Sequence, residues 1–323
     1  MGRKVSIVIP VLNSGPALEK AISACNEQDY PKEDFEIIVV DDGSTEKIKD
    51  ICDAKGVSYL RQERSGPAKA RNTGWKASCG SIICFTDADC VPERQWLACL
   101  VSALASEDIA AVGGSYENNN PESLLACCIH EEIILRHERM PKFVKAIGSY
   151  NMAVRRDVLE RINGFDEGFA MASAEDNDLS YRLSRNGYRL LFDPSIKVAH
   201  RHPRALRRYL ASQFWHGFWR VRLYLKHPRM VSGDDYSNII DYAQPFICLA
   251  AMVSLALSFY PFFRTAAVFF LAAEAATHIP AAMAITFKKG HPKYMALIPI
   301  LSLRSFSRSL GMACGIIGGH NGK

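Results

Sequence analysis

Acidic residues are scarce in the second part of the sequence. Residues 201–323 contain 15 Lys and Arg but only four acids, Asp234, Asp235, Asp241 and Glu274, which gives a formal net charge of +11. Residues 1–200 contain 24 Lys and Arg against 30 Asp and Glu, a net charge of −6, so the overall value of +5 conceals the division. Because 48% of the chain is apolar and 23% is charged, a disordered or low-complexity chain is excluded. The sequence therefore predicts a folded protein with two electrostatically distinct parts.

The ten cysteines show no C-x-x-C or zinc-finger spacing. A chain of 323 residues buries enough surface to fold without disulfide cross-links. Cys84, Cys248 and others lie inside apolar runs, which is typical of reduced core thiols in a cytosolic compartment. The first apolar stretch, residues 5–11, is too short and too rich in β-branched residues to predict a signal peptide.

The first 90 residues alternate between predicted strands and predicted helices. We expect strands at residues 5–10, 35–40 and 81–85, and helices that begin near residues 16, 46 and 66. This order predicts an α/β fold with a mostly parallel sheet and helices on both faces. Ligands bind such sheets beyond the carboxyl ends of the strands, where the segments "DDGST" and "TDAD" fall. No Gly-rich phosphate loop follows the first strand, where Pro10 stands instead, which disfavours a nucleotidyltransferase.

The following region is less regular in its hydrophobic pattern. We expect one strand at residues 150–155 and helices at residues 93–104, 124–139 and 174–186. A polar turn, "NNNPES", lies between the first two of these helices.

Residues 201–229 are basic and aromatic. They contain eight Lys and Arg and no acid. As a helix, this segment would place Phe214, Phe218, Val221 and Leu225 on one apolar stripe. Basic residues beside aromatic ones on an amphipathic helix favour a membrane interface. Nucleic acid is the rival partner, and the apolar sequence that follows disfavours it.

Two long apolar runs follow, at residues 244–263 and 265–287. The first has no charge, and the second contains only Glu274 and His278. Each is long enough to cross a hydrocarbon core of about 30 Å, so the pair predicts a membrane hairpin with its turn at residues 261–265. Basic residues flank it on both sides, and the positive-inside rule then predicts that the amino-terminal domain faces the cytoplasm. The basic residues are Arg222, Lys226, Arg229, Lys288, Lys289 and Lys293.

Two other interpretations of the hairpin remain open: a pair of Ala-rich core helices in a soluble protein, or a surface that binds a partner. A third apolar run, residues 295–317, carries Arg304 and Arg308. We expect this run to lie in the membrane interface rather than to span the membrane.

Asp87 and Asp89 directly follow the strand predicted at residues 81–85. Two carboxylates at this spacing can turn to one point beyond the sheet edge, where hard oxygen ligands suit Mg²⁺ or Mn²⁺. Such an ion can bridge a diphosphate, so Asp87 is a candidate for both metal and substrate binding. The alternative is a surface turn with solvated aspartates.

Asp41 and Asp42 end the strand predicted at residues 35–40. Carboxylates there can accept hydrogen bonds from ribose hydroxyls or from a base N–H, although a helix N-cap cluster is an equal alternative. Arg71 lies on the next helix near the same edge. It can meet diphosphate charge, but most charges on helices are simply solvated.

Glu175, Asp176 and Asp178 crowd negative charge at the start of a predicted helix. The positive end of a helix favours acids, which is a structural explanation for them. Crowding also raises the pKa of a carboxylate, which suits a general base. His200, in "VAHRHP", can complete a metal site or lie at the membrane edge.

Taken in order, these segments resemble glycosyltransferase family 2, the inverting GT-A enzymes that use nucleotide-diphospho sugars. The matching segments, which run over about residues 5–202, are "VSIVIPVLN", "QDYPKEDFEIIVVDDGST", "GPAKARNTG", "CFTDADC", "NGFDEGF", "AEDNDLSYRLSRNGYRLLFDP" and "VAHRHP". By this resemblance, Pro10, Asn13 and Asp42 line the nucleoside pocket, and Arg71 helps to bind the nucleotide or its diphosphate.

The same resemblance implies the roles of the acidic residues. Asp87 and Asp89 match the D-x-D of the family, with Asp89 the more direct metal ligand, and His200 stands where many members place a metal-contacting histidine. Asp176 matches the catalytic base, which takes the proton of an acceptor hydroxyl while one displacement inverts the anomeric carbon. Processive synthases of the family also carry Q-x-x-R-W, but here Gln213 begins "QFWHGFW". This departure favours a single-addition enzyme over a polymerase.

We therefore expect a GT-A catalytic domain at residues 1–202, an amphipathic interface helix at 203–236 and a helical membrane region at 237–323. The expected function is metal-dependent inverting transfer of a sugar from a nucleotide-diphospho sugar to a membrane-borne glycan or lipid-linked oligosaccharide. Mg²⁺ or Mn²⁺ is the expected cofactor, and membrane lipids but no nucleic acid are the expected partners. Three arginines are then expected to contact phosphates of the acceptor: Arg204, Arg207 and Arg208. The alternatives are an enzyme that loads one sugar onto polyprenyl phosphate and a catalytically silent membrane scaffold.

Overall fold

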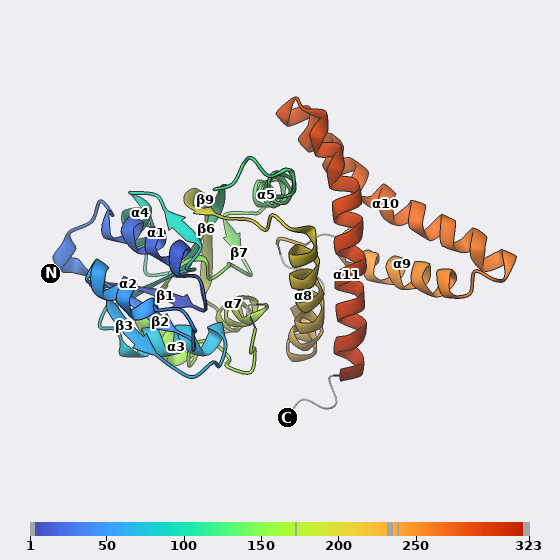
Figure 1. Cartoon of the computed structure of the whole chain (residues 1–323). Coiled ribbons are helices and arrows are strands. Elements are labelled where there is room, and N and C mark those ends of the chain that lie inside the picture. The colour runs from blue at the N-terminus through green and yellow to red at the C-terminus, as the bar shows by residue number, and fades with distance from the viewer. Residues whose placement is uncertain (1–3, 172, 231–234, 238, 319–323) are drawn as a thin grey trace. The chain divides into compact units, whose positions relative to one another are not determined.

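The structure, a computed structural model, describes residues 4–171, 173–230, 235–237 and 239–318 (Figure 1). The chain forms two compact units. The first comprises Met1–Asn119 and Met140–Arg201, and the second comprises Asn120–Arg139 and His202–Lys323. Residues 120–139, which we expected in the first domain, thus pack with the C-terminal helices. The predicted limits of the functional domains at residues 202 and 236 remain predictions.

Four neighbouring strands make the parallel half of the sheet in the first unit. Their order is β3-β2-β1-β4, and every pairing between them is parallel. The strands are β1 (Val5–Val11), β2 (Phe35–Asp41), β3 (Ser58–Arg61) and β4 (Ile82–Thr86). β1 is buried along its whole length, as its continuous apolar run requires. The predicted strands at residues 5–10, 35–40 and 81–85 are confirmed, and β3 is an addition.

The other half of the sheet is mixed. β8 (Asn151–Arg155) is antiparallel to both β4 and β6 (Ile109–Asn118), and β6 is parallel to β9 (Arg189–His200). Two short strands, β5 (Cys90–Pro92) and β7 (Phe143–Val144), lie antiparallel to β9. The α/β fold class is confirmed, and only the β3-β2-β1-β4 half of the sheet is parallel throughout.

Helices cover both faces of the sheet (Figure 1). On one face the buried apolar side chains come from α1 (Gly15–Asn26), α2 (Ile48–Lys55) and α4 (Trp96–Ala103). On the other face they come from α3 (Pro67–Ala77), α6 (Arg156–Arg161) and α7 (Glu175–Arg185). α3 lies close to the sheet because Gly74 has no side chain: a Cβ there would lie 2.4 Å from Val8 Cγ1.

The second unit is helical in its described residues. It contains α5 (Leu124–His137), α8 (Leu206–Lys226), α9 (Ile239–Ala256), α10 (Pro261–Lys289) and α11 (Leu297–Gly318). A small apolar core joins α5, α10 and α11, with Cys128, Ile285 and Leu301 among its buried members.

α8 and α11 approach each other at glycines. A Cβ on Gly217 of α8 would lie 2.0 Å from the carbonyl oxygen of Arg308, and one on Gly311 of α11 would lie 1.9 Å from that of Phe214. The buried column of α8 is therefore Tyr209, Gln213, Gly217 and Val221. Of the predicted apolar stripe, only Val221 is buried, and Leu225 is 75% exposed; its contact with a membrane interface remains a prediction. Small residues lie on the buried face of α8 because they allow the backbones of the two helices to approach each other closely.

α9 and α10 are the only helices of the described residues that are long and apolar enough to cross a membrane. The most apolar window of each has a mean hydropathy of 1.6, and only 22% of it is buried within the structure. Phe246, Phe262 and Phe287 are each at least 75% exposed. The predicted turn at residues 261–265 is wrong, because Pro261 occupies the first turn of α10, a position that proline favours. The turn lies at residues 257–260.

Candidate active site

The carboxyl edge of the parallel strands gathers the polar side chains that the sequence singled out. β1, β2 and β4 end here, with Val11 opposite Asp41 in the register of β1 and β2. The segments that follow these strands carry Asn13, Asp42 and Asp87. This part of the prediction is confirmed in its topology, because parallel strands bring their carboxyl ends to one edge.

Asp41 is fully buried, and the protein itself supplies its hydrogen-bond donors. One carboxylate oxygen accepts the Ser44 N–H (2.7 Å), and the other accepts the Tyr59 hydroxyl (2.8 Å) and Arg61 Nη1 (3.0 Å). Burial alone would raise the pKa of Asp41, but the hydrogen bonds from Ser44 and Tyr59 lower it below the usual range. These contacts favour a role in shaping the turn after β2, and substrate binding by Asp41 remains a prediction.

Asp42 holds the loop that leads into α3. One carboxylate oxygen accepts Gln62 Nε2 (2.7 Å) and the Ser65 N–H (2.8 Å), and the other accepts the Gly66 N–H (2.8 Å). The side chain that the resemblance assigned to the nucleoside pocket thus fixes the loop that leads into α3, and its contact with a nucleoside remains a prediction. A carboxylate has about four acceptor positions, so one remains for a ligand.

Asn13 lies just beyond β1 in a left-handed conformation, with φ 50°. Its N–H donates to Ser44 Oγ (3.0 Å), and its side-chain oxygen accepts the Thr45 N–H (2.8 Å). The two turns that follow β1 and β2 are therefore tied together. Pro10, inside β1 and buried, lies opposite Val40. Contact of Pro10 and Asn13 with a nucleoside remains a prediction.

Arg71 is buried and bridges two carboxylates. Nη2 donates to Asp87 (2.7 Å), and Nη1 donates to Glu175 (2.9 Å). The guanidinium also lies 5.6 Å from the ring centre of Phe165. The structure thus joins the end of β4 to the start of α7 through one side chain. Arg71 was predicted to meet the diphosphate, and two of its nitrogens are used within the protein instead.

Glu175 and Asp176 begin α7, where Ala174 has a φ of 80°. Burial and the neighbouring Asp176 raise the pKa of Glu175 to about 7. Burial raises the pKa of Asp176 too, against the opposing charge of Arg71. Asp176 is only half-buried, whereas Glu175 is 3% exposed, and one of its carboxylate oxygens has no hydrogen-bond donor. Asp176 is therefore the carboxylate of this pair that a substrate can reach.

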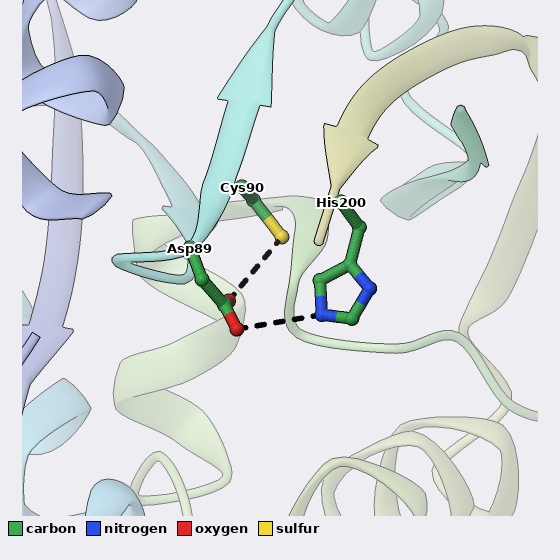
Figure 2. A group of neighbouring side chains, drawn as sticks. All are labelled: Asp89, Cys90 and His200. Carbon is green, nitrogen blue, oxygen red and sulfur yellow. Dashed lines mark hydrogen bonds and ion pairs between the residues drawn. The ribbon is translucent and has the colours of Figure 1, made fainter. Parts of the chain in front are cut away.

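A second group lies where β5 meets β9 (Figure 2). Figure 2 shows the Asp89 carboxylate between the Cys90 thiol and the His200 ring. His200 Nε2 lies 3.5 Å from Asp89 Oδ2, and Cys90 is opposite His200 in the strand register. The possible ligand atoms of the three residues all lie within 4.8 Å of one another. The structure thus places Asp89 and His200 side by side, and their role as metal ligands remains a prediction.

The donors present fit a divalent cation. The side chain of Asp89 is 46% exposed, and carboxylate and imidazole are both suitable ligands. Cys90 is a poor ligand because burial raises the pKa of its thiol well above the usual range, and only the thiolate binds a metal well. Asp87, predicted as a further ligand, lies outside this group and pairs with Arg71. Its role in metal binding remains a prediction.

Three aromatic residues of the site were missed by the sequence analysis. Tyr116 stacks on Tyr150 with ring centres 3.7 Å apart, and its ring centre lies 5.0 Å from that of His200. Phe165 lies under Arg71. No motif marks Tyr116 and Tyr150, because strand pairing and not sequence proximity brings them here. Phe165 lies in "NGFDEGF", a segment of the resemblance that carried no predicted role for it. Cys90, by contrast, was visible beside Asp89 in "DADC".

The fold and this edge define a GT-A type α/β protein. Residues 6–163 match the glycosyl transferase family 2, and the chain belongs to this family. The resemblance seen in the sequence is thereby confirmed.

Two curated relatives are named glycosyltransferases. The glycosyltransferase AglE of Haloferax volcanii is 30% identical over 203 residues, which cover 61% of this chain and 66% of the relative. The pre-mycofactocin glycosyltransferase of Mycobacterium tuberculosis is 30% identical over 240 residues, which cover 70% of this chain and 48% of the relative. The chain thus matches between about half and two thirds of the length of these relatives.

Solved structures support the fold. A mannosyltransferase from Pyrobaculum calidifontis, solved with GDP-Man and Mn²⁺, aligns with a TM-score of 0.64 and 23% identity over 98% of this chain and 88% of its own. GalNAc-T7, solved with UDP, GalNAc and Mn²⁺, aligns with a TM-score of 0.51 and 19% identity over 73% of this chain and 52% of its own. At these identities the likeness concerns the fold alone.

Proposed function

We propose that this chain transfers a sugar from a nucleotide-diphospho sugar to a hydroxyl of a membrane-borne acceptor, with inversion at the anomeric carbon. The observation that carries the proposal is the Arg71 bridge. It holds Asp87, beside the proposed metal site, and Glu175, beside the proposed base, in one buried ion-pair network. An enzyme that separates a leaving diphosphate from an attacking hydroxyl needs those two functions at a fixed separation.

The nucleotide is proposed to lie beyond the ends of β1 and β2. Asn13 and Asp42 are tied to the turns there, so the loops that would contact the nucleoside are already ordered. Asp42 keeps an acceptor position for a base or ribose donor. The ligands of the solved GT-A neighbours, GDP-Man in one and UDP with GalNAc in the other, support a nucleotide-diphospho sugar as the substrate class.

The metal is proposed to be Mn²⁺, held by Asp89 and His200 with Asp87 nearby. Mg²⁺ prefers oxygen ligands in near-octahedral geometry, so an imidazole in the donor set favours Mn²⁺ over Mg²⁺. Such an ion supplies Lewis-acid stabilisation of a leaving diphosphate. In this chain, Asp89 and His200 would orient the ion, and Arg71 would keep Asp87 in place.

Asp176 is proposed as the general base. Its carboxylate is half-buried at the start of α7, and burial raises its pKa, which suits proton abstraction near neutral pH. One oxygen accepts the N–H of Asn177 at 2.8 Å, so the orientation of the carboxylate is fixed. Glu175, more deeply buried and paired with Arg71, would position the base electrostatically.

The acceptor is proposed to be lipid-linked because the second unit has a large exposed apolar surface. α9 and α10 expose most of their apolar side chains, and the flanking charge favours a cytoplasmic catalytic unit. Arg207 and Arg208 are exposed at the start of α8, and Arg204 pairs with Glu122. Changing these three arginines to Glu should raise the KM for a lipid acceptor; an unchanged KM would remove them from the proposal.

The decisive experiment measures nucleotide release by detergent-solubilised full-length protein. UDP-, GDP- and dTDP-sugars are tested with Mn²⁺ or Mg²⁺. We expect one donor family to be turned over, EDTA to abolish the turnover and Asp176→Asn to lower it by about 10²–10⁴-fold, the usual contribution of a general base.

The matched control is Asp157→Asn. Asp157 is an exposed aspartate on α6 that pairs with Arg161 at the surface, so its exchange should leave turnover unchanged. Turnover that survives both EDTA and Asp176→Asn would refute the proposed chemistry. Metal-dependent nucleotide binding without turnover would mean that the acceptor is missing, and no nucleotide binding at all would favour the silent scaffold.

A further inference from the structure

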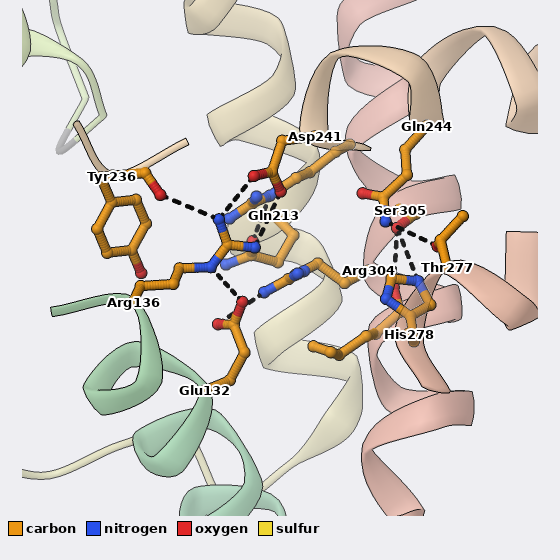
Figure 3. A network of polar contacts seen from close by, with 12 residues as sticks. Glu132, Arg136, Gln213, Tyr236, Asp241, Gln244, Thr277, His278, Arg304 and Ser305 are labelled. Atoms are coloured by element: carbon orange, nitrogen blue, oxygen red, sulfur yellow. Dashed lines mark hydrogen bonds and ion pairs between the residues drawn. The ribbon is translucent and has the colours of Figure 1, made fainter. Parts of the chain in front are cut away.

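A polar network joins three helices inside the second unit (Figure 3). Arg136 of α5 donates to both carboxylate oxygens of Asp241 on α9, at 2.7 and 2.9 Å. It also donates to Glu132 on its own helix, whose other carboxylate oxygen accepts Arg304 of α11 at 3.1 Å. Each oxygen of these two carboxylates thus accepts a guanidinium N–H from Arg136 or Arg304.

Arg308 follows Arg304 by one turn of α11, and it adds a third guanidinium. Its Nε donates to the side-chain oxygen of Gln213 on α8, at 2.7 Å. Among the residues that the structure describes, no carboxylate bonds to Arg308. The network thus has one more positive than negative charge, and the excess lies on Arg308.

The surroundings make this excess charge unfavourable. Burial, followed by the charge of Arg304, lowers the pKa of Arg308 to about 10. The nearby His216 on α8 has its pKa lowered to about 3 by burial and then by Arg308, so it stays neutral. A guanidinium that is partly removed from water without an anion is unfavourable, and a bound anion would offset that cost.

Arg308 also has the geometry to bind an anion. Its Nε is used by Gln213, which fixes the plane of the guanidinium and leaves the two terminal nitrogens. Those nitrogens form the fork that binds phosphate oxygens in pairs. The residue is half-buried rather than buried, so a ligand can reach it. Arg220 of α8 adds further positive potential at this position.

We infer that Arg308, oriented by Gln213 and backed by Arg304 and Arg220, binds the phosphate monoester headgroup of a membrane lipid. The lipid nature follows from the helices of the same unit, because α9 and α10 expose apolar side chains along most of their length. The inference rests on the proposed membrane contact of this unit, but not on sugar transfer. Two sources of the headgroup have the same chemistry: an anionic glycerolipid and a polyprenyl phosphate.

The test is calorimetric titration of the full-length protein in a neutral detergent. The probes are short-chain phosphatidic acid, a short polyprenyl monophosphate, inorganic phosphate and short-chain phosphatidylcholine. We expect at least one of the two phosphate-monoester lipids to bind, with phosphatidylcholine and inorganic phosphate much weaker. Arg308→Gln should weaken that binding by about tenfold to a hundredfold, the usual effect of losing charged hydrogen bonds. Arg308→Lys, which keeps the charge but not the fork, should weaken it less.

The matched control is Arg264→Gln, which removes an exposed arginine from the start of α10 and should leave binding unchanged. Which of the two lipids binds more tightly identifies the source of the headgroup. Inorganic phosphate that binds as tightly as the lipids, or Arg308→Gln that binds them like the wild type, would overturn the inference.

Folding and catalysis are checked on the same samples. Because Arg308→Gln removes an uncompensated charge, its Tm without lipid should equal or exceed that of the wild type; a clear decrease would contradict the charge excess. Titration of wild-type protein with a nucleotide-diphospho sugar and Mn²⁺ is run in parallel. Failure of the proposed function then appears as absent donor binding, and failure of the lipid site as absent lipid binding with donor binding intact.

Discussion

The guanidinium of Arg71 shows why charge on a sequence is an incomplete guide to function. A basic residue near the sheet edge predicts contact with a diphosphate, but Asp87 and Glu175 take two of its nitrogens. The partner on α7 is 104 residues away in sequence. No local pattern reveals such a pairing, because it depends on how β4 and α7 meet at the edge. We therefore expect Arg71 to position the two carboxylates, and its predicted contact with the diphosphate remains a prediction.

The first prediction concerns the pH dependence of turnover in Arg71 variants. The charge of Arg71 lowers the pKa of both Glu175 and Asp176, so Arg71→Gln should raise both. A base acts only when deprotonated, so the acid limb of the pH–rate profile should move to higher pH by about one unit, or about 1.4 kcal/mol. The loss of turnover should then be about tenfold larger at the acidic end than above pH 8. Steady-state rates measured from pH 5 to 9 test this.

Arg71→Lys is the control for charge, and its acid limb should stay near that of the wild type. Removing Arg71 leaves two carboxylates without their partner and should cost about 3–5 kcal/mol of stability, so the Tm of each variant is measured first. An acid limb that does not move in folded Arg71→Gln would argue against Asp176 as the base.

A second prediction at this scale concerns His200. His200→Asn removes the imidazole beside Asp89, so the Mn²⁺ concentration for half-maximal turnover should rise at least about tenfold. The preference for Mn²⁺ over Mg²⁺ should shrink as well, since the nitrogen ligand is gone. His291→Asn, a change at an exposed histidine outside the first unit, is the control. Equal Mn²⁺ titrations of His200→Asn and wild type would remove His200 from the metal site.

At the scale of elements, the strands with a continuous apolar pattern were predictable from the sequence, whereas the strands interrupted by glycine or proline were not. β1, β2 and β4 are continuous apolar runs, as buried parallel strands require. β6, in contrast, contains Gly113, Gly114 and Ser115, and β9 contains Pro194. Glycine and proline weaken a strand pattern. β6 and β9 pair with each other, with an irregular register at Gly114 and Ser115. This pairing stabilises two strands that local propensity does not predict.

The predictable strands explain which parts of the site could be foreseen. Asp42, Asp87 and Asp89 follow short regular strands, and the prediction that they lie at one edge of the sheet was correct. Tyr116 lies on β6 and Tyr150 directly precedes β8. Only the pairing of these strands brings the two rings together and to His200, so their contacts could not be foreseen.

A third prediction concerns the contact of α8 with α11. Gly311→Ala would place a methyl group 1.9 Å from a backbone carbonyl oxygen of α8. A backbone atom cannot move aside as a flexible side chain can, so the two helices must separate. The loss of stability should exceed the roughly 1–3 kcal/mol that ordinary overpacking of a core costs. We expect a clear decrease in Tm in thermal unfolding of the detergent-solubilised protein.

Gly318→Ala is the matched control on the same helix. Its added methyl group would meet only Phe218, at 3.7 Å, which is an ordinary contact. A Tm for Gly311→Ala equal to that of Gly318→Ala would show that α8 and α11 are not in close contact.

On the scale of the whole molecule, the charge division of the sequence follows the two units only in part. The acidic region contributes α5 to the second unit, where Glu132 and Glu131 pair with Arg304 and Lys289. Composition alone could not place α5 in the second unit, because α5 lies far in sequence from the helices on which it packs. Acidic residues of α5 thus compensate part of the excess positive charge of residues 201–323.

The last prediction concerns the membrane topology of the α9–α10 hairpin. Arg264 lies near its turn, whereas Lys288 and Lys289 lie at the other end of α10, 24 residues or about 36 Å further along the helix. If the hairpin spans the membrane with its basic flanks in the cytoplasm, Arg264→Cys should react with a membrane-impermeant maleimide added to intact cells. Lys288→Cys should react only after permeabilisation. The wild type, whose Cys79, Cys99 and Cys314 are exposed, gives the background labelling. Labelling of both new cysteines only after permeabilisation would mean that the hairpin does not cross, and its apolar surface would then have to be covered by a partner or by one leaflet.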